Sequence, residues 1–596
     1  MPPMPTRSHE TPRVIHTDLG GGAFTLHSPE PLQAYARCVG EWLEQWARET
    51  PDAPAFAEAA AAGAWTTLSW RELRQRVGAV AQALLDLRLP AAQPIAVLSD
   101  NSLDHLVLLL AGMHIGIPVC SISSAYCRLA QGDYSRLHGV LQVLGPSLVF
   151  ASSATTYAPA LNGAGLDAVA VFSEGAAGES LAFGELQKTT ETPAVMAAFA
   201  AVTPDTHAKY LLTSGSTGQP KVVINTQRML CANQQMLVQG WRELLQGHRP
   251  VLLDWLPWSH TFGGNHNVHL VLRSGGTMFI DDGRPMPGLI DKTLAHLREV
   301  QPTLHFNVPR GYEMMLPALE ADRELARRFF DKLRMVFYAG SGMPPSTWRR
   351  LEAAAAAVRT EPLFMATSWG ATETSPAVTA LTWRVQQPGL IGLPLPGATV
   401  KFVPSAGKFE MRVKGDHVFP GYRDNAAATR AAFDDDGFYR IGDAGLLLDR
   451  ADPQQGIVFD GRVAEDFKLT SGTWVSVGTL RVKLVSALAP WVQDVVVTGH
   501  DRSEIGALLF LTEAARALPQ GQIEAQVRSA LLALSVEASG SSQTPARALA
   551  LPDGPHAAAG EITDKGYLNQ RLVLARRAAD VEALYATPPG ARVILA

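Results

Sequence analysis

Cysteine is scarce in this chain. The 596 residues contain four thiols, Cys38, Cys120, Cys127 and Cys231, and no two of them form a CxxC pair. The sequence therefore excludes a disulfide framework and a cysteine zinc ribbon. We expect reduced, mostly buried thiols in a cytoplasmic protein.

An excess of positive charge is lacking as well. Charged residues make up 18% of the chain, and the formal net charge is −5. A protein that binds nucleic acid by neutralising phosphates needs a basic surface, so that class is excluded. The N-terminus lacks an apolar secretion segment, and no apolar run reaches the length of a membrane span. We expect small-molecule partners, with no nucleic acid and no membrane.

The chain is too long for one compact core, so we expect more than one domain. Up to about residue 200, helical patterns alternate with apolar runs such as 94–99 and 147–152, which favours an α/β layered domain. Residues 1–30 are rich in Pro, Gly and Thr, and we expect them to meander before a helix near 31–50.

The texture changes in the second half of the chain. Short strands punctuated by Gly and Pro predict a small β subdomain at about 390–461. A fresh start after Gly461 and Arg462, with its own strands and helices, predicts a second domain. The fold class we expect is α/β: a large N-terminal domain, 1–461, and a smaller, mobile α+β C-terminal lid, 462–596.

The most informative segment is 210–221, an apolar strand followed by hydroxyls, two glycines and a lysine. Gly215 and Gly218 let the backbone turn its N–H groups toward an anion, and Lys221 supplies positive charge. A Walker A loop is excluded, because Pro220 precedes the lysine and a strand-like run follows it, so we predict strand, loop, strand. The alternative is a polar surface turn. Further donors in the loop are the hydroxyls of Thr213, Ser214, Ser216 and Thr217.

This loop resembles the phosphate loop of the adenylate-forming superfamily, which includes acyl-CoA synthetases, amino-acid-activating domains and luciferases. Four further segments, in the order of that family, extend the resemblance over about residues 205–570. The resemblance implies ATP, Mg²⁺ and coenzyme A as the small molecules that the chain uses.

Residues 368–374 resemble the family's aromatic-Gly-x-Thr-Glu motif. The resemblance implies that Trp369 packs on adenine, Thr372 hydrogen-bonds the α-phosphate and Glu373 holds Mg²⁺. One or two carboxylates plus phosphate oxygens are what nucleotide-bound Mg²⁺ prefers. The alternative is the first turn of a surface helix.

Two other segments correspond to nucleotide contacts in the family. Gly340, Ser341 and Gly342 lie in a stretch that wraps adenine there, although a strand followed by a Gly-Pro turn needs no ligand. Asp443 matches an aspartate that accepts hydrogen bonds from both ribose hydroxyls, and Arg462 matches an arginine that also meets the ribose. Many members have an acidic hinge residue two positions after this arginine and a second arginine eleven positions after it.

In this chain those two positions hold Ala464 and Thr473, so the pivot of the hinge is not fixed by the resemblance. Lys565, in 560–571, resembles the lysine that reaches the carboxylate and α-phosphate across the domain gap; a cation there stabilises the meeting of two anions. Taken alone, Lys565 reads as a surface lysine.

The resemblance makes His260 the gate beside the acyl pocket, with Phe262, Gly263 and Gly264 shaping its wall. Two small glycines near aromatic residues would leave a flat slot suited to a planar aryl acid. The alternative is a zinc site made by His260, His266 and His269, but no HExxH motif or cysteine partner accompanies them.

Within the superfamily, segments 214–226, 258–267, 414–422 and 561–567 are most similar to bacterial feruloyl-CoA synthetases. We therefore expect an ATP-dependent ligase of phenylpropanoid degradation that converts ferulate or a related hydroxycinnamate to its CoA thioester through an acyl-adenylate, releasing AMP and pyrophosphate. Alternatives are a CoA ligase for another aryl or medium-chain acid, or a non-catalytic nucleotide-binding relative. A homodimer is possible. A serine hydrolase is disfavoured by the lack of a GxSxG elbow.

Overall fold

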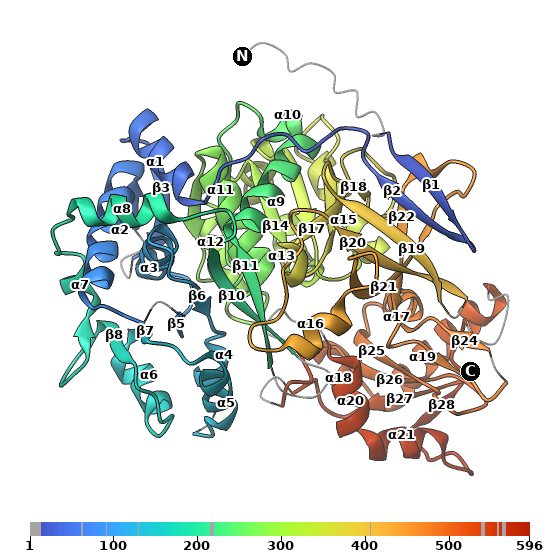
Figure 1. Ribbon diagram of the computed structural model, residues 1–596. Helices are drawn as coiled ribbons and strands as arrows, with labels where there is room; N and C mark the ends of the chain where they lie inside the picture. Colours follow the sequence, from blue (N-terminus) through green and yellow to red (C-terminus); the bar gives the residue numbers. More distant parts are fainter. Residues whose placement is uncertain are drawn as a thin grey trace.

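The computed structural model describes residues 13–60, 64–90, 92–128, 130, 132–214, 220–405, 407–471, 473–537, 543–556, 559–562 and 568–596. Figure 1 shows several sheets with helices packed around them, and the elements after residue 462, in orange and red, gathered at one end. Among the described helices, none is long and apolar enough to cross a bilayer.

A seven-stranded sheet in the order β11-β10-β6-β5-β7-β8-β9 forms the first layer, and only the β10–β11 pair is antiparallel. β5 and β6 are buried along their whole length, as parallel strands covered by helices on both faces must be. The strands are β5 (Ile95–Val97), β6 (Val119–Ser121), β7 (Leu148–Ser153), β8 (Val169–Glu174), β9 (Leu181–Ala182), β10 (His207–Ser214) and β11 (Pro220–Thr226).

The helices associated with this sheet carry recognisable start signals. In α2 the Ser69 side chain accepts from the Glu72 N–H while the Glu72 side chain accepts from the Ser69 N–H, a capping box. The helices are α2 (Trp70–Asp86), α3 (Leu103–His114), α4 (Ala125–Arg128), α5 (Ser135–Leu144), α6 (Ala154–Leu161), α7 (Phe183–Leu186), α8 (Pro193–Ala201) and α9 (Gln227–Gly240).

Two further sheets adjoin each other, because β12 lies beside β14, where the Thr303 N–H donates to the Val251 carbonyl at 2.9 Å. One has the order β12-β13-β3-β4: β12 (Val251–Asp254), β13 (Thr277–Ile280), β3 (Pro54–Ala59) and β4 (Trp65–Ser69). The other has the order β14-β15-β16-β17-β18: β14 (Leu304–Asn307), β15 (Met335–Tyr338), β16 (Met365–Gly370), β17 (Ala377–Ala380) and β18 (Leu393–Pro394).

The helices between the strands of these two sheets include a π-helix, a form that is uncommon outside functional sites. They are α1 (Gly40–Glu49), α10 (Arg242–Leu245), the π-helix η1 (Phe262–Asn267), α11 (Val268–Ser274), α12 (Ile290–His296), α13 (Pro309–Ala321), α14 (Arg323–Asp331), α15 (Pro345–Ala356) and the 3-10 turn η2 (Thr372–Thr374).

A six-stranded antiparallel sheet has the order β1-β2-β19-β20-β21-β22. Its first hairpin corrects an expectation: residues 15–27 do not meander but form two strands, and β2 pairs with β19, where His27 lies opposite Thr399 (Figure 1). The elements are β1 (Ile15–Gly20), β2 (Ala23–His27), β19 (Thr399–Ser405), β20 (Lys408–Lys414), β21 (Tyr439–Leu447), β22 (Ile457–Arg462), α16 (Ala426–Ala432) and the 3-10 turn η3 (Pro453–Gln455).

The C-terminal elements bury cores of their own. In α19, Ile523, Val527, Leu531 and Leu534 recur at helical spacing and are all buried in one of these cores. The sheet order is β25-β26-β27-β28. The elements are β23 (Phe467–Lys468), β24 (Trp474–Val475), α17 (Val477–Ala487), β25 (Val492–Thr498), β26 (Gly506–Leu511), α18 (Glu513–Arg516), α19 (Gln520–Glu537), β27 (Arg547–Leu551), α20 (Gln570–Arg576), α21 (Ala578–Tyr585) and β28 (Val593–Leu595).

The expected fold class is confirmed: the chain has a large N-terminal α/β part and a smaller C-terminal α+β part. The four cysteines are buried and free, as expected from their spacing. The precise division at residues 461 and 462 stays a prediction, as does movement of the C-terminal part.

Candidate active site

The candidate nucleotide residues lie at the carboxyl ends of β15 and β16, which are parallel neighbours. Gly340, Ser341 and Gly342 follow β15 and are exposed, whereas Trp369 is the last residue but one of β16 and is buried. Ligands of open α/β sheets bind at this end of the strands, so the position suits a binding site.

Gly370 allows the sharp reversal after β16. A Cβ atom at this position would lie 1.7 Å from the Pro376 carbonyl oxygen, so no side chain fits without moving the backbone. The reversal places Thr372 and Glu373 in η2, between two paired strands, with Glu373 buried. Glycine is thus needed here for close packing of two backbone segments.

Glu373 is joined to the phosphate loop through Tyr422. The Tyr422 hydroxyl donates to Glu373 Oε1 at 3.0 Å, and the Lys221 Nζ lies 4.8 Å from the centre of the Tyr422 ring. Burial raises the pKa of Glu373, while the Tyr422 hydroxyl and the charges of Arg462 and Lys221 oppose that shift. One tyrosine therefore contacts a carboxylate and a lysine that are far apart in sequence.

Asp443 is held between two other predicted residues. The indole N–H of Trp369 donates to Asp443 Oδ2 at 2.8 Å, and Arg462 Nε lies 3.3 Å from Oδ1, across the β21–β22 pair. Burial raises the pKa of Asp443, and Arg462 and Trp369 oppose the rise. Oδ1 is buried and accepts no hydrogen bond from the described residues, so it is available to a ligand hydroxyl.

These residues fit a magnesium nucleotide. Glu373 offers one buried carboxylate whose other neighbours are a phenol and a lysine, and Mg²⁺ on a nucleotide takes one or two carboxylates together with phosphate oxygens. A metal ion is not required to explain the fold of η2. Elsewhere in the described chain, the one set of residues spaced to share a metal is Asp281, Asp282 and His296.

The structure describes the two strands that flank the phosphate loop. β10 and β11 pair antiparallel, with Thr213 opposite Lys221, as the predicted strand, loop, strand arrangement requires. Gly215, Ser216, Thr217 and Gly218 lie outside the described residues, and so does the side chain of Ser214.

Lys565 also lies outside the described residues, but its flanks are placed. Ile562 and Leu568 form an antiparallel bridge on either side of it. A Cβ atom at Gly560 would lie 3.8 Å from Arg136 Nη1 in α5, and α5 contacts β11. The flank of the predicted lysine motif is therefore close to the helix that borders the phosphate-loop hairpin.

A lysine from β20 contacts the chain on both sides of Arg462. Lys408 Nζ pairs with the Asp466 carboxylate, donates to the Asp460 carbonyl at 2.7 Å and donates to Ser476 Oγ at 2.9 Å. Lys408 therefore spans the position of the predicted hinge, where Ala464 supplies no charge of its own.

His260 precedes η1, and its carbonyl accepts from the Gly264 N–H at 2.8 Å. The expectation that Gly263 and Gly264 leave an open slot is wrong. Cβ atoms there would lie 2.4 Å from the Leu256 carbonyl and 2.3 Å from the Trp258 carbonyl, so both glycines face backbone rather than free space. They let the π-helix pack against residues 256–258.

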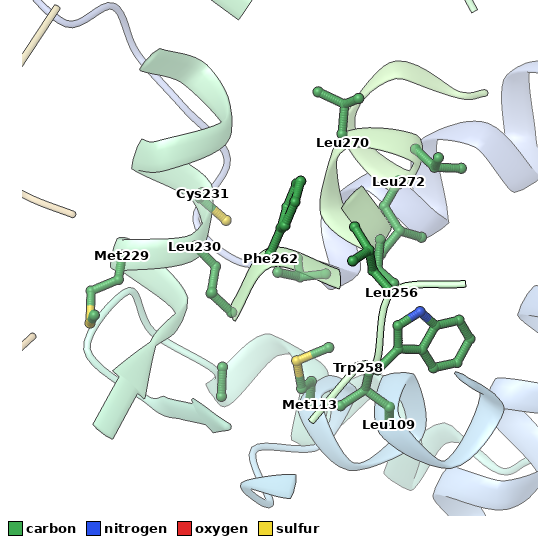
Figure 2. Packing of buried hydrophobic residues seen from close by; sticks show 14 of the residues in the cluster. Leu109, Met113, Met229, Leu230, Cys231, Leu256, Trp258, Phe262, Leu270 and Leu272 are labelled. Carbon is green, nitrogen blue, oxygen red and sulfur yellow. The ribbon is translucent and has the colours of Figure 1, made fainter. Parts of the chain in front are cut away.

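Buried side chains from three helices surround this segment (Figure 2). Together they fix η1 and its neighbours in one well-packed position. The labelled residues are Leu109 and Met113 of α3, Met229, Leu230 and Cys231 of α9, Leu256, Trp258 and Phe262 of the segment itself, and Leu270 and Leu272 of α11.

The three histidines 260, 266 and 269 do not form a metal-ligand cluster within the described chain. His266 instead lies among aromatic rings, with ring centres 5.8 Å from Phe262, 5.2 Å from Phe306 and 5.2 Å from Phe337. The aromatic rings near this segment therefore come from Phe262 of η1, Phe306 of β14 and Phe337 of β15, and all three are buried.

Sequence reasoning did not select Tyr422 or His266 as site residues. Tyr422 closes the segment 414–422, which was noted only for its resemblance, and its contact with Glu373 spans 49 residues. His266 was considered as a zinc ligand and otherwise lay only within the segment 258–267 that carries the resemblance. The signal that could have selected it is the neighbouring Asn267, since an amide next to a histidine in an apolar run suggests a buried hydrogen bond.

Comparisons with known proteins identify the family. A sequence profile of the AMP-binding enzyme family matches residues 43–423, and one of the AMP-binding enzyme C-terminal domain matches 469–588. A probable CoA ligase from Humulus lupulus is 25% identical over 345 residues, 54% of this chain and 53% of that protein. The match thus spans about half of the length of this relative.

Two other proteins match over most of their length. A long-chain-fatty-acid–CoA ligase from Mycobacterium bovis is 26% identical over 608 residues, covering 88% of this chain and 93% of the relative. The crystal structure of ATP-bound MatB from Rhodopseudomonas palustris is 23% identical, with a TM-score of 0.69, covering 90% of this chain and 99% of that chain. Since the family profile matches residues 43–423, well over half of this chain, the chain belongs to the AMP-binding enzyme family.

Proposed function

We propose that the chain is an AMP-forming carboxylate–CoA ligase. The observation that carries the proposal is the set of contacts that joins five of the predicted residues. Lys221 lies over the Tyr422 ring, whose hydroxyl donates to Glu373, and the Asp443 carboxylate accepts from the Trp369 indole and pairs with Arg462. A non-catalytic relative would have no need to keep a buried carboxylate and a lysine at the phosphate end together with a ribose-binding aspartate.

The reaction would run in two steps. First, a carboxylate oxygen of the acid attacks the α-phosphorus of ATP, forming the acyl-adenylate as pyrophosphate leaves. Then the thiolate of coenzyme A attacks the carbonyl carbon of the adenylate, forming the thioester as AMP leaves. Both steps bring anions together, so preorganised positive charge is needed.

The residues divide this work. Lys221 and Lys565 supply positive charge to the phosphates, Thr372 donates to the α-phosphate, and Glu373 would hold Mg²⁺, which when bound neutralises phosphate oxygens. Trp369 and residues 340–342 would contact adenine, Asp443 and Arg462 would hold the ribose, and His260 would border the acid. The phosphate-loop donors would be Thr213, Ser214 and Ser216, with Gly215, Thr217 and Gly218.

We propose ferulate or a related hydroxycinnamate as the acid. The support is the group of aromatic rings at Phe262, Phe306 and Phe337 next to the segment that begins at His260. The Mycobacterium bovis relative is named for long-chain fatty acids, so a fatty acid is a competing substrate. Another aryl or a medium-chain acid is the remaining alternative.

The deciding experiment is mass detection of the acyl-adenylate. The protein is incubated with Mg-ATP and ferulate without coenzyme A, and coenzyme A is then added. We expect feruloyl-AMP in the first stage and its conversion to feruloyl-CoA in the second. ATP binding without adenylate formation from any acid of a panel, from ferulate to palmitate, would contradict the ligase proposal; adenylate from palmitate alone would contradict only the acid.

The remaining expectations are tested separately. Light scattering of the pure protein would show whether it forms the homodimer considered above. Removal of Mg²⁺ with a chelator should abolish adenylate formation and be reversed by added Mg²⁺.

A further inference from the structure

Buried polar atoms without a hydrogen-bond partner gather around η1. A buried polar atom without a partner costs roughly 1–3 kcal/mol, so a group of them is expected where a ligand or ordered water supplies the missing partners. In the described residues the group includes Trp258 Nε1, Asn265 Oδ1, His266 Nε2, both ring nitrogens of His269, Gln234 Oε1 and Asn225 Nδ2.

His266 has the best-defined surroundings in this group. Its side chain is 1% exposed and lies among four aromatic rings, which we call the aromatic box. Since ring carbons make no strong hydrogen bonds, Nε2 has no alternative partner on these walls. The box consists of Trp241 at 6.1 Å, Phe262 at 5.8 Å, Phe306 at 5.2 Å and Phe337 at 5.2 Å between ring centres.

The proton on His266 can be placed from its neighbours. His266 Nδ1 lies 2.9 Å from Asn267 Oδ1, an atom that only accepts hydrogen bonds. Nδ1 therefore carries the proton.

It follows that Nε2 is an acceptor. Burial lowers the pKa of His266 to about 4, so the ring is neutral near pH 7 and Nε2 bears a free lone pair. A lone pair in an apolar box is satisfied by a ligand that donates, such as a hydroxyl. A methyl ether or an alkyl chain has no hydrogen to donate.

The aromatic box shares three of its four rings, those of Phe262, Phe306 and Phe337, with the proposed acid site. Phe306 and Phe337 are direct neighbours on β14 and β15, so their rings lie on one face of the sheet, and η1 covers that face. Gly340 follows Phe337 by three residues, and His260 precedes Phe262 by two. The box thus lies below the strand end that leads into the predicted adenine contact.

We propose that His266 Nε2 accepts a hydrogen bond from a hydroxyl on the ring of the acid, and that this bond selects hydroxylated aryl acids over their methoxy and unsubstituted analogues. The proposal rests on the ligase function proposed above. It makes His266 a specificity residue, which the reaction chemistry itself does not need.

The test compares three acids that differ at one ring position: 4-hydroxycinnamate, 4-methoxycinnamate and cinnamate. Acid-dependent pyrophosphate release gives kcat/KM for each. The native protein should prefer the hydroxy acid over both analogues by roughly tenfold or more, because a buried acceptor is left unpaired by the others. A native protein that uses cinnamate as well as 4-hydroxycinnamate would overturn the proposal without any variant.

His266→Phe keeps a flat ring in the box and removes the acceptor. We expect kcat/KM for 4-hydroxycinnamate to fall roughly tenfold and the preference over cinnamate to shrink to about one, while cinnamate itself is used no worse. Unchanged preference in this variant would refute the assignment of Nε2.

The matched control is His305→Phe. His305 is also buried and lies one residue before Phe306, but it faces the other side of β14, where its Nδ1 is 3.2 Å from the Tyr312 hydroxyl. This variant should keep the preference for the hydroxy acid. If no acid of the panel gives an adenylate even with the native protein, the ligase function fails, an outcome distinct from activity without hydroxyl preference.

Discussion

Asp443→Asn tests the ribose contact most directly. The carboxylate accepts from Trp369 at 2.8 Å and lies 3.3 Å from Arg462, and both partners are donors. In the variant, the amide oxygen can serve only one of them, and the NH₂ group must face the other donor. A ribose hydroxyl therefore loses a charged acceptor and meets a crowded, neutral one.

The expected size follows from hydrogen bonds to charged and neutral groups. A bond to a charged group contributes about 1.5–3 kcal/mol and a bond to a neutral group about 0.5–1.5 kcal/mol, so each ribose hydroxyl loses roughly 1–1.5 kcal/mol. Two hydroxyls give about 2–3 kcal/mol, or roughly a 30- to 150-fold rise in the KM for ATP. The fold should be kept, because burial already disfavours the ionised carboxylate.

The assay is acid-dependent pyrophosphate release with ATP and with 2′-deoxy-ATP. The native enzyme should discriminate against the deoxy nucleotide by roughly tenfold, whereas Asp443→Asn should discriminate by about twofold or less. Asp416→Asn serves as a control, since Asp416 accepts a hydrogen bond from the Tyr35 hydroxyl in an exposed contact. An Asp443→Asn enzyme that still discriminates like the native one would refute the assignment of the ribose to Asp443.

Four other changes have expected outcomes. Tyr422→Phe removes the donor that orients Glu373, so the concentration of Mg²⁺ at half-maximal activity should rise roughly 10- to 100-fold, and an unchanged magnesium titration would contradict this. Lys565→Ala should abolish single-turnover adenylate formation and leave thioester formation from added acyl-adenylate nearly intact; equal loss of both steps would remove the proposed role. Gly370→Ala should lower the free energy of unfolding by at least roughly 1–3 kcal/mol, because its Cβ would overlap a carbonyl, whereas Gly139→Ala in α5, with open space around it, should raise it by up to about 1 kcal/mol. Burial lowers the pKa of Lys209 to about 7, so this side chain destabilises the fold most below pH 7, and the penalty fades as the pH rises toward 10.5. Lys209→Met should therefore raise the free energy of unfolding by roughly 1–4 kcal/mol at pH 6 and by much less at pH 10. Urea titrations at both pH values would show this difference.

Local patterns predicted the parts of the molecule that local forces determine. The hydroxyls, glycines and lysine of 210–221 needed only their spacing to be placed between two strands, and β10 and β11 take that arrangement. The same holds for α19, where the burial of Ile523 and Val527 follows from helical periodicity.

Contacts across long distances in sequence were out of reach. Nothing near residues 15–27 indicates that they pair with 399–405, because a strand is stabilised by its neighbours in the sheet more than by its own composition. Likewise, Tyr422 becomes important only when the fold brings it to Glu373. The role of small residues was also predicted wrongly. Gly263 and Gly264 suggested free space, but the Leu256 and Trp258 carbonyls lie so close that no side chain fits at either position.

The pairing of β2 with β19 can form only late in synthesis on the ribosome. His27 pairs with Thr399, so 399 − 27 = 372 residues must be translated between the two halves of this ladder. At about 5–20 residues per second, the first hairpin waits roughly 20–75 s with an open strand edge. Until then the nascent chain carries a β-ribbon that can pair wrongly with another polypeptide, so slower elongation should increase its dependence on chaperones that bind nascent chains.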